Sequence, residues 1–152
     1  MAIFFVQHGK SLPKEMDPDR GLSEKGIAEV KRICEIAKAS GVKVSGIHHS
    51  VKTRAHQTAE IFTAIMDPGG GVQQISGMNP LDDVVDFSTT LDPFENLMFV
   101  GHLPFMERLT SLLITGSIEI PVFKFQNGGI LCLDKDPDAK SWVIRWSIVP
   151  NI

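Results

Sequence analysis

The sequence has few of the features that mark secreted proteins. It contains two cysteines among 152 residues, Cys34 and Cys132, which lie far apart among apolar neighbours. Such sparse cysteine indicates buried, reduced thiols in place of a disulfide framework. The N-terminus lacks the basic region and long apolar core of a signal peptide, because Phe4–Val6 is followed at once by Gln7 and His8. We therefore expect a cytoplasmic protein.

Two further absences narrow the range of partners. No apolar run approaches the roughly 18 residues that cross a bilayer, so we expect no membrane partner. The formal net charge is −3, which argues against a nucleic-acid binder that works through overall positive charge. Hydrophobic residues make up 43% of the chain and charged residues 22%, as in ordinary globular proteins. No repeat, low-complexity tract or linker divides the chain, so we expect a single domain over residues 1–152.

The hydrophobic pattern predicts strands that alternate with helices. Such alternation predicts an α/β fold, a sandwich around a mainly parallel central sheet, with some antiparallel pairing near the end. In chain order we expect a strand over Ile3–Val6, a loop over Leu12–Gly21, a helix over Glu24–Ala39 capped by Ser23, a strand over Val44–His48, a helix over Val51–Ile65 capped by Ser50, a short strand over Val72–Ile75, a helical turn or short helix over Phe87–Leu91, a strand over Leu97–Val100, a helix from Phe105 to about Thr115, and strands over Ile118–Phe125, Gly129–Leu133 and Trp142–Val149.

Polar side chains follow three of the predicted strands. Gln7 and His8 come after the first strand, Arg54 lies in the first turn of the helix that follows the second, and His102 comes after the strand over Leu97–Val100. Ligands of open α/β sheets bind at the carboxyl ends of the strands. Side chains in a first helical turn tilt toward the N-terminus, so Arg54 would lie over these strand ends beside free backbone N–H groups. This combination predicts an anion site, and phosphate suits it best.

The two imidazoles add chemistry that binding alone does not need. One can act as a nucleophile, and the other can donate a hydrogen bond to a transferring phosphoryl group. The other histidines indicate less. His48 and His49 are adjacent in a strand and would face opposite sides, so we expect no shared metal ion. We expect His56 on a solvated helix face, and Gly69–Gly71 is not a P-loop because no Gly-Lys-Ser/Thr follows it.

Several segments resemble the histidine phosphatase superfamily. Gln7–Gly9 followed by Gly21–Gly26 is similar to the opening of that family, which normally has Arg-His-Gly and then Leu-Thr/Ser-x-x-Gly. His49–Ala59 resembles the segment Ser-x-x-x-Arg-Ala-x-Gln-Thr, and Val100–Pro104 resembles the segment of the second histidine. The short chain and the Gly-His-Leu-Pro form are similar to the small SixA-like phosphohistidine phosphatases. The motifs occur in order from Ile3 to about residue 113.

This resemblance implies a phosphoglycerate mutase-like, three-layer fold with helices on both faces of the sheet, and a role for each matched residue. His8 would attack phosphorus and form a covalent phosphohistidine that water later hydrolyses. Arg54 and His102 would bind the phosphoryl oxygens and stabilise the charge that develops during transfer. The wider superfamily often uses a carboxylic acid to protonate the leaving group; the candidates are Asp82 and Asp83, with Asp83 preferred, although a solvated acidic loop is the alternative. No metal ion or organic cofactor is implied.

One position departs from the family pattern, because Gln7 stands where the family has arginine. Arginine offers a permanent charge and a fork of donors, whereas a glutamine amide offers two neutral N–H donors. Loss of one charge-assisted contact to phosphate costs roughly 1.5–3 kcal/mol, a factor of about ten to a hundred or more. Lys10 could supply charge from the following loop, although its spacing does not match that of the missing group.

The sequence therefore predicts a phosphohistidine phosphatase that acts on a phosphorylated signalling protein, such as a histidine-containing phosphotransfer domain, through phospho-His8. Two alternatives stay open: a phosphatase of small phosphoesters, and a binding module for phosphate or phosphoproteins with little turnover, which Gln7 favours. A structural or interaction protein without a phosphate site is the least favoured, because three motifs converge on one site.

Overall fold

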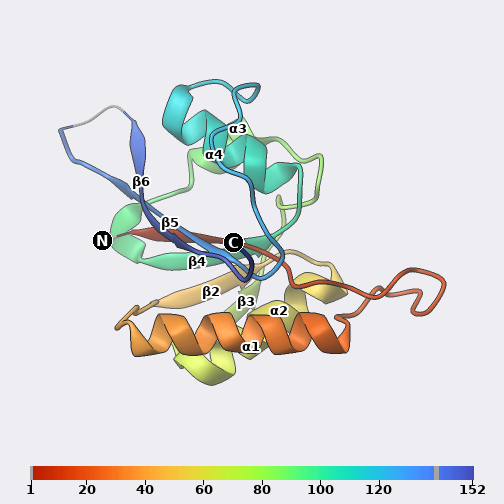
Figure 1. Cartoon of the computed structure of the whole chain (residues 1–152). Helices are drawn as coiled ribbons and strands as arrows, with labels where there is room; N and C mark the ends of the chain where they lie inside the picture. Colours follow the sequence, from red (N-terminus) through yellow and green to blue (C-terminus); the bar gives the residue numbers. More distant parts are fainter. Residues whose placement is uncertain (1, 139–140) are drawn as a thin grey trace.

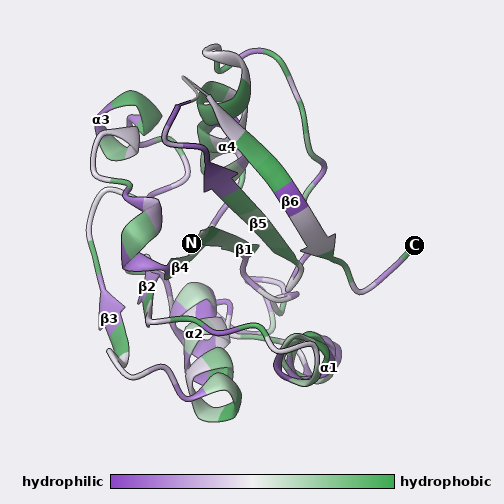
Figure 2. Ribbon diagram, turned by 90° about the vertical axis from the view of Figure 1, so that its left-hand side faces the viewer, coloured by the Kyte–Doolittle hydropathy of each residue, from purple (hydrophilic) through white to green (hydrophobic). Residues whose placement is uncertain are grey.

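The computed structural model describes residues 2–138 and 141–152, and in them a sheet of six strands lies between two layers of helices (Figures 1 and 2). Helices α1 and α2 cover one face, and α3 and α4 cover the other. The elements in chain order are β1 (Ile3–Gln7), α1 (Glu24–Ala39), β2 (Gly46–His49), α2 (Thr53–Met66), β3 (Val72–Gln74), α3 (Val84–Ser88), the 3-10 helix η1 (Pro93–Glu95), β4 (Leu97–Gly101), α4 (Phe105–Thr115), β5 (Ile130–Lys135) and β6 (Trp142–Ile148).

The strand order is β3-β2-β4-β1-β5-β6. β1 pairs in parallel with β4, and β2 pairs in parallel with both β4 and β3, whereas β5 runs antiparallel to β1 and β6 antiparallel to β5. The register places Gln7 beside Gly101, and His49 beside Val100. The carboxyl ends of β1, β2 and β4 therefore meet at one edge of the sheet, and the predicted α/β fold with a mainly parallel sheet is confirmed.

β1 is buried on both faces, which explains its uninterrupted apolar sequence. Phe4 and Val6 belong to the core under α1 and α2, while Ile3 and Phe5 belong to the core under α3 and α4. Alternate side chains of one strand thus fill two cores. None of the helices in the described residues is both long and apolar enough to cross a membrane.

The predicted helix over Glu24–Ala39 is confirmed, with Ser23 at its N-cap accepting a hydrogen bond from the Gly26 amide at 3.0 Å. The prediction that Ser50 caps the next helix is wrong. α2 begins at Thr53 after Lys52, whose side chain makes no capping bond. The Ser50 hydroxyl instead lies 2.5 Å from the Nε2 atom of His102. The short helix expected over Phe87–Leu91 begins earlier, at Val84.

The strand predicted over Ile118–Phe125 is also wrong, since this segment is an irregular connection between α4 and β5. Ile118 and Ile120 are 44% and 52% exposed, and only the end of the segment, at Phe125, is buried in the core under α3 and α4. Pro121 in the middle has no N–H to donate to a ladder. β-propensity describes a fit to a half-buried pleated surface, and this segment has no such surface to join.

Candidate active site

A pocket of about 390 Å³ opens at the edge where β1, β2 and β4 end. It contains four of the five residues that the sequence predicted for the site, all except Asp83. Its lining consists of Gln7, His8, Lys10, Ser11, Arg20, Arg54, His102, Leu103 and Asn127. The topology therefore brings together residues that are up to 120 positions apart, because the parallel strands β1, β2 and β4 end at the same edge of the sheet.

His8 is held in one tautomer. Its Nδ1 atom lies 2.7 Å from the carbonyl oxygen of Gly9, and because a carbonyl only accepts, Nδ1 carries the proton and donates. The Nε2 atom then holds the lone pair of the neutral ring and accepts a hydrogen bond from Nε of Arg54 at 3.3 Å. Burial, with the positive charges of Arg54 and Arg20, lowers the pKa of His8 to about 4, against the effect of the Gly9 bond. At neutral pH the ring therefore has a free electron pair beside a guanidinium.

His102 lies next to His8, with the two ring centroids 5.1 Å apart. It is fully buried, and Nε2 is paired with the Ser50 hydroxyl, whereas Nδ1 has no hydrogen-bond partner among the described residues. Burial lowers the pKa of His102 to about 3, and the neighbouring His8, Arg54 and Lys52 add to the shift. The second imidazole is thus also neutral, with one nitrogen held by the protein.

Two residues that follow Arg54 in α2, Gln57 and Thr58, hold the neighbouring loops in place by hydrogen bonds. The Thr58 hydroxyl donates to the Arg54 carbonyl at 2.8 Å and accepts from the Gly9 amide at 2.9 Å, which ties α2 to the end of β1. The side-chain oxygen of Gln57 accepts from the Leu22 amide at 2.7 Å. In the segment Arg-Ala-x-Gln-Thr, arginine therefore faces the pocket, while glutamine and threonine hold the neighbouring loops.

Among the pocket residues that the sequence reasoning missed are Arg20 and Asn127. Arg20 lies in the loop after β1 that projects from the body of the protein (Figure 1), and its Nη2 atom donates to the Ser11 hydroxyl at 3.3 Å. Asn127 donates from Nδ2 to the His8 carbonyl at 2.9 Å across 119 positions of sequence. An arginine in an unusually long loop was a signal for the first. The Asn127–Gly128 turn gave no sign of the second.

Asp83 lies away from this pocket. Its carboxylate caps α3 by accepting from the amides of Val85 at 2.8 Å and Asp86 at 3.4 Å. Asp82 accepts from the Asn79 amide at 2.8 Å, and all three aspartates line a different pocket beside α3. A role for Asp83 as proton donor stays a prediction that this geometry does not favour.

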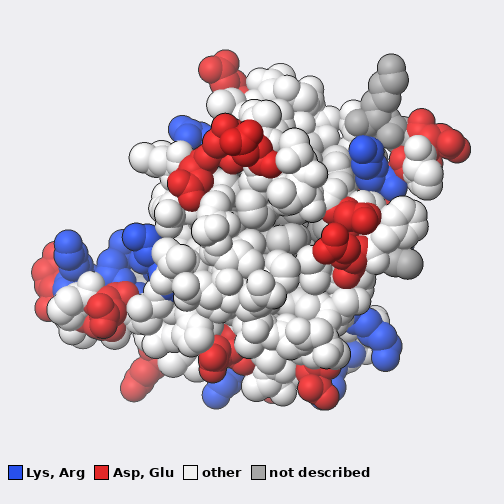
Figure 3. All heavy atoms as spheres, turned by 180° about the vertical axis from the view of Figure 1, so that it is seen from behind, with Lys and Arg blue, Asp and Glu red and all other residues white. Residues whose placement is uncertain are grey.

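On the face opposite to that of Figure 1, positive charge is not concentrated. Figure 3 shows a group of acidic side chains on the upper part of that face, basic side chains mainly at its edges and a broad uncharged area below. In contrast, Lys10, Arg20 and Arg54 all line the pocket of His8. Positive charge is thus gathered at the strand ends, where an anion would bind.

No family model matches the chain. An uncharacterised protein of Picosynechococcus sp. is 31% identical to it over 112 residues, which cover 68% of this chain and 67% of that protein. The structure of the protein histidine phosphatase SixA complexed with tungstate matches with a TM-score of 0.83 and 24% identity, over 99% of this chain and 97% of that one. SixA of Agrobacterium tumefaciens matches with a TM-score of 0.75 and 22% identity, over 98% and 97%. The chain therefore belongs to one family with the Picosynechococcus protein, and its fold is the SixA-like fold of the histidine phosphatase superfamily.

Proposed function

We propose that this protein is a phosphatase that transfers a phosphoryl group to His8 and then to water. One observation carries the proposal: the Nε2 lone pair of His8 faces Arg54 in a pocket that also contains His102 and Arg20. A buried histidine that only contributes to packing does not require an oriented electron pair in a pocket with two guanidinium groups. A nucleophile for a phosphoryl group needs both features.

The proposed reaction has two steps. In the first, Nε2 of His8 forms a bond to phosphorus as the bond to the leaving group breaks, and the leaving atom takes the electron pair. Arg54 donates to the phosphoryl oxygens, and His102 borders the same space. In the second step the oxygen of a water molecule forms a bond to phosphorus as the bond between phosphorus and Nε2 breaks. Nε2 takes back the electron pair, the proton of the water passes to solvent, and inorganic phosphate leaves with His8 neutral again. The Gly9 carbonyl accepts from Nδ1 throughout, so it also stabilises the ring once Nε2 carries the phosphoryl group.

Phosphohistidine on a signalling protein is the substrate that we favour, and the position of Asp83 supports it. An alcohol leaving group needs an acid to protonate it. The preferred acid caps α3 and lines another pocket. A phosphohistidine leaving group is an imidazole, which can be protonated before the bond breaks. The site is thus better suited to a nitrogen leaving group than to a phosphoester.

Turnover of phosphohistidine carried by a phosphotransfer protein tests this proposal, measured beside turnover of an aryl phosphomonoester. We expect release of phosphate from the phosphoprotein and much slower release from the ester. Faster hydrolysis of the ester would favour a phosphatase of small phosphoesters. Tight phosphate binding without turnover of either would favour the binding module that Gln7 suggests.

Gln7→Arg is expected to raise the affinity for inorganic phosphate by about tenfold or more, because a charge-assisted contact replaces a neutral one. Calorimetric titration with phosphate measures the change. An unchanged affinity would contradict this prediction and would indicate that Arg20, which lines the same pocket, already supplies the missing charge. Arg20→Gln in both backgrounds separates these outcomes.

Activity is expected to persist at a lower pH than an ordinary histidine would allow. The nucleophilic form of His8 is the unprotonated one, and it is lost only as the pH falls through its pKa of about 4. For a histidine with its usual pKa near 6.5, the loss would occur more than two pH units higher. NMR titration of the His8 ring protons, with kcat/KM for the aryl ester over the same range, checks this. A midpoint near 6.5 would contradict the burial argument.

A further inference from the structure

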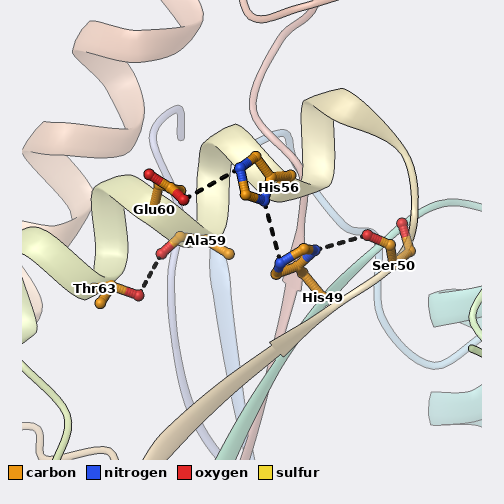
Figure 4. Close-up of polar contacts among 6 residues, drawn as sticks. All are labelled: His49, Ser50, His56, Ala59, Glu60 and Thr63. Carbon is orange, nitrogen blue, oxygen red and sulfur yellow. Dashed lines mark hydrogen bonds and ion pairs between the residues drawn. The ribbon is translucent and has the colours of Figure 1, made fainter. Parts of the chain in front are cut away.

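A second pair of histidines lies outside the pocket, between β2 and α2 (Figure 4). His49 is at the end of β2 and is 3% exposed, whereas the His56 side chain on α2 is about half exposed. The Nε2 atom of His49 and the Nδ1 atom of His56 are 3.3 Å apart. The prediction that His56 simply faces solvent therefore misses a contact with a buried imidazole.

The outer nitrogens of both rings face acceptors. Nδ1 of His49 lies 2.7 Å from the Ser50 carbonyl oxygen, and Nε2 of His56 lies 3.2 Å from a carboxylate oxygen of Glu60. A carbonyl and a carboxylate only accept, so each outer nitrogen carries a proton. With only these protons, the lone pairs of His49 Nε2 and His56 Nδ1 face each other. Either a further proton or a metal ion between the two nitrogens would resolve this opposition.

A metal ion suits this gap. Two nitrogens bound to one tetrahedral zinc ion at about 2.0–2.1 Å are about 3.3–3.4 Å apart, and the observed separation is 3.3 Å. Metal-binding histidines typically donate their other N–H to a carbonyl or carboxylate, as His49 does to Ser50 and His56 does to Glu60.

We propose that His49 and His56 bind a divalent transition-metal ion of the kind that prefers imidazole, with zinc as the representative. The described residues contain no group of three or more His, Cys, Asp or Glu side chains that could hold a metal. The protein thus supplies two ligands, and water supplies the others from the side where His56 and Glu60 are half exposed. This is a weaker site than a structural zinc centre with four protein ligands.

The ion would affect the pocket from outside it. His49 contacts the carbonyl of Ser50, and the hydroxyl of Ser50 contacts His102. An ion that fixes the orientation of the His49 ring also fixes its Nδ1–H group, which donates to the Ser50 carbonyl. Zinc at this site would therefore stabilise the position of Ser50 beside His102 without contacting a substrate.

Zinc binding by the purified protein tests the proposal directly, in competition with a chromophoric chelator at neutral pH. We expect one equivalent to bind, with an affinity that His56→Gln lowers by more than the roughly ten- to hundredfold that loss of an outer-shell partner costs. His49→Gln should have the same effect, and Glu60→Gln a smaller one. His48→Gln is the matched control, since His48 is adjacent in β2 but packs against Phe99. Each variant is also measured with His8→Ala, which removes zinc held by the pocket imidazoles.

Equal zinc affinity in wild type, His56→Gln and His48→Gln would overturn the proposal, as would no binding at micromolar free zinc. In that case a shared proton occupies the gap, and NMR would show the pair taking up one proton. His49 is buried, so its variant is compared with wild type by circular dichroism, while the half-exposed His56 tests the proposal without that risk. The readout is metal binding, so its outcome is independent of whether the protein hydrolyses phosphohistidine.

Discussion

His8→Ala is expected to lower turnover by at least about a thousandfold, the scale seen when a covalent nucleophile is removed. The loss follows from the geometry, because no other imidazole nitrogen in the pocket has both a fixed lone pair and a guanidinium donor beside it. Phosphate release from a phosphotransfer protein measures the rate. Acid-quenched samples with labelled substrate should show a labelled protein for wild type and none for the variant.

The control for this variant is His48→Ala, which removes an imidazole from β2 that faces Phe99 and not the pocket. It should retain turnover and the labelled intermediate. Turnover that persists in His8→Ala would rule out His8 as the nucleophile. An intermediate that forms in wild type but is not hydrolysed would limit the protein to one step of the proposed reaction.

Arg54→Ala is expected to lower kcat by about 100- to 1,000-fold, the usual cost of losing one donor to a developing anion. Arg54 is the side chain that already donates to Nε2 of His8, and the same guanidinium can donate to phosphoryl oxygens once that atom is bonded to phosphorus. Arg54→Lys should recover only part of the rate, since an ammonium group lacks the planar fork. Steady-state kcat and KM with single-turnover rates measure these effects.

Arg108→Ala is the matched control, because Arg108 is exposed on α4 and does not line the pocket. It should leave kcat unchanged. A loss of less than threefold in Arg54→Ala would mean that Arg20 can stabilise the phosphoryl charge when Arg54 is absent. The double variant of Arg54 and Arg20 would then lose what neither single variant loses.

The sequence was sufficient for those parts of the site that depend on strand ends. His8 and His102 each follow a strand, Arg54 lies in the first turn of the helix after another strand, and parallel strands place their carboxyl ends at one edge of a sheet. The rule needs only the order of elements, so no knowledge of side-chain packing was required. β1, α1 and β4 were predictable for the same reason, since their hydrophobic periods are unambiguous.

The remaining parts depend on contacts that no local pattern encodes. Ser50 looks like a helix cap, but its hydroxyl pairs with a residue 52 positions away. Asp83 looks like an acid near the site, but it caps a short helix elsewhere. Asn127 belongs to a turn whose role is set by the carbonyl of His8 on another element. Local propensity cannot predict which partner such a side chain takes, because the local hydrogen bond and the competing tertiary contact have similar free energies.

The central place of β1 has a consequence for how the protein is made. This strand is synthesised before both of its neighbours in the sheet, because β4 and β5 begin only at Leu97 and Ile130. The nascent chain must therefore carry β1 with both edges unpaired until β4 and β5 have been synthesised, which exposes this apolar strand to aggregation. The hydrogen bond from Asn127 to the His8 carbonyl likewise needs a residue 119 positions further along the chain. His8 is thus synthesised long before the elements that hold it in place, and the activity proposed for it would depend on completion of the sheet.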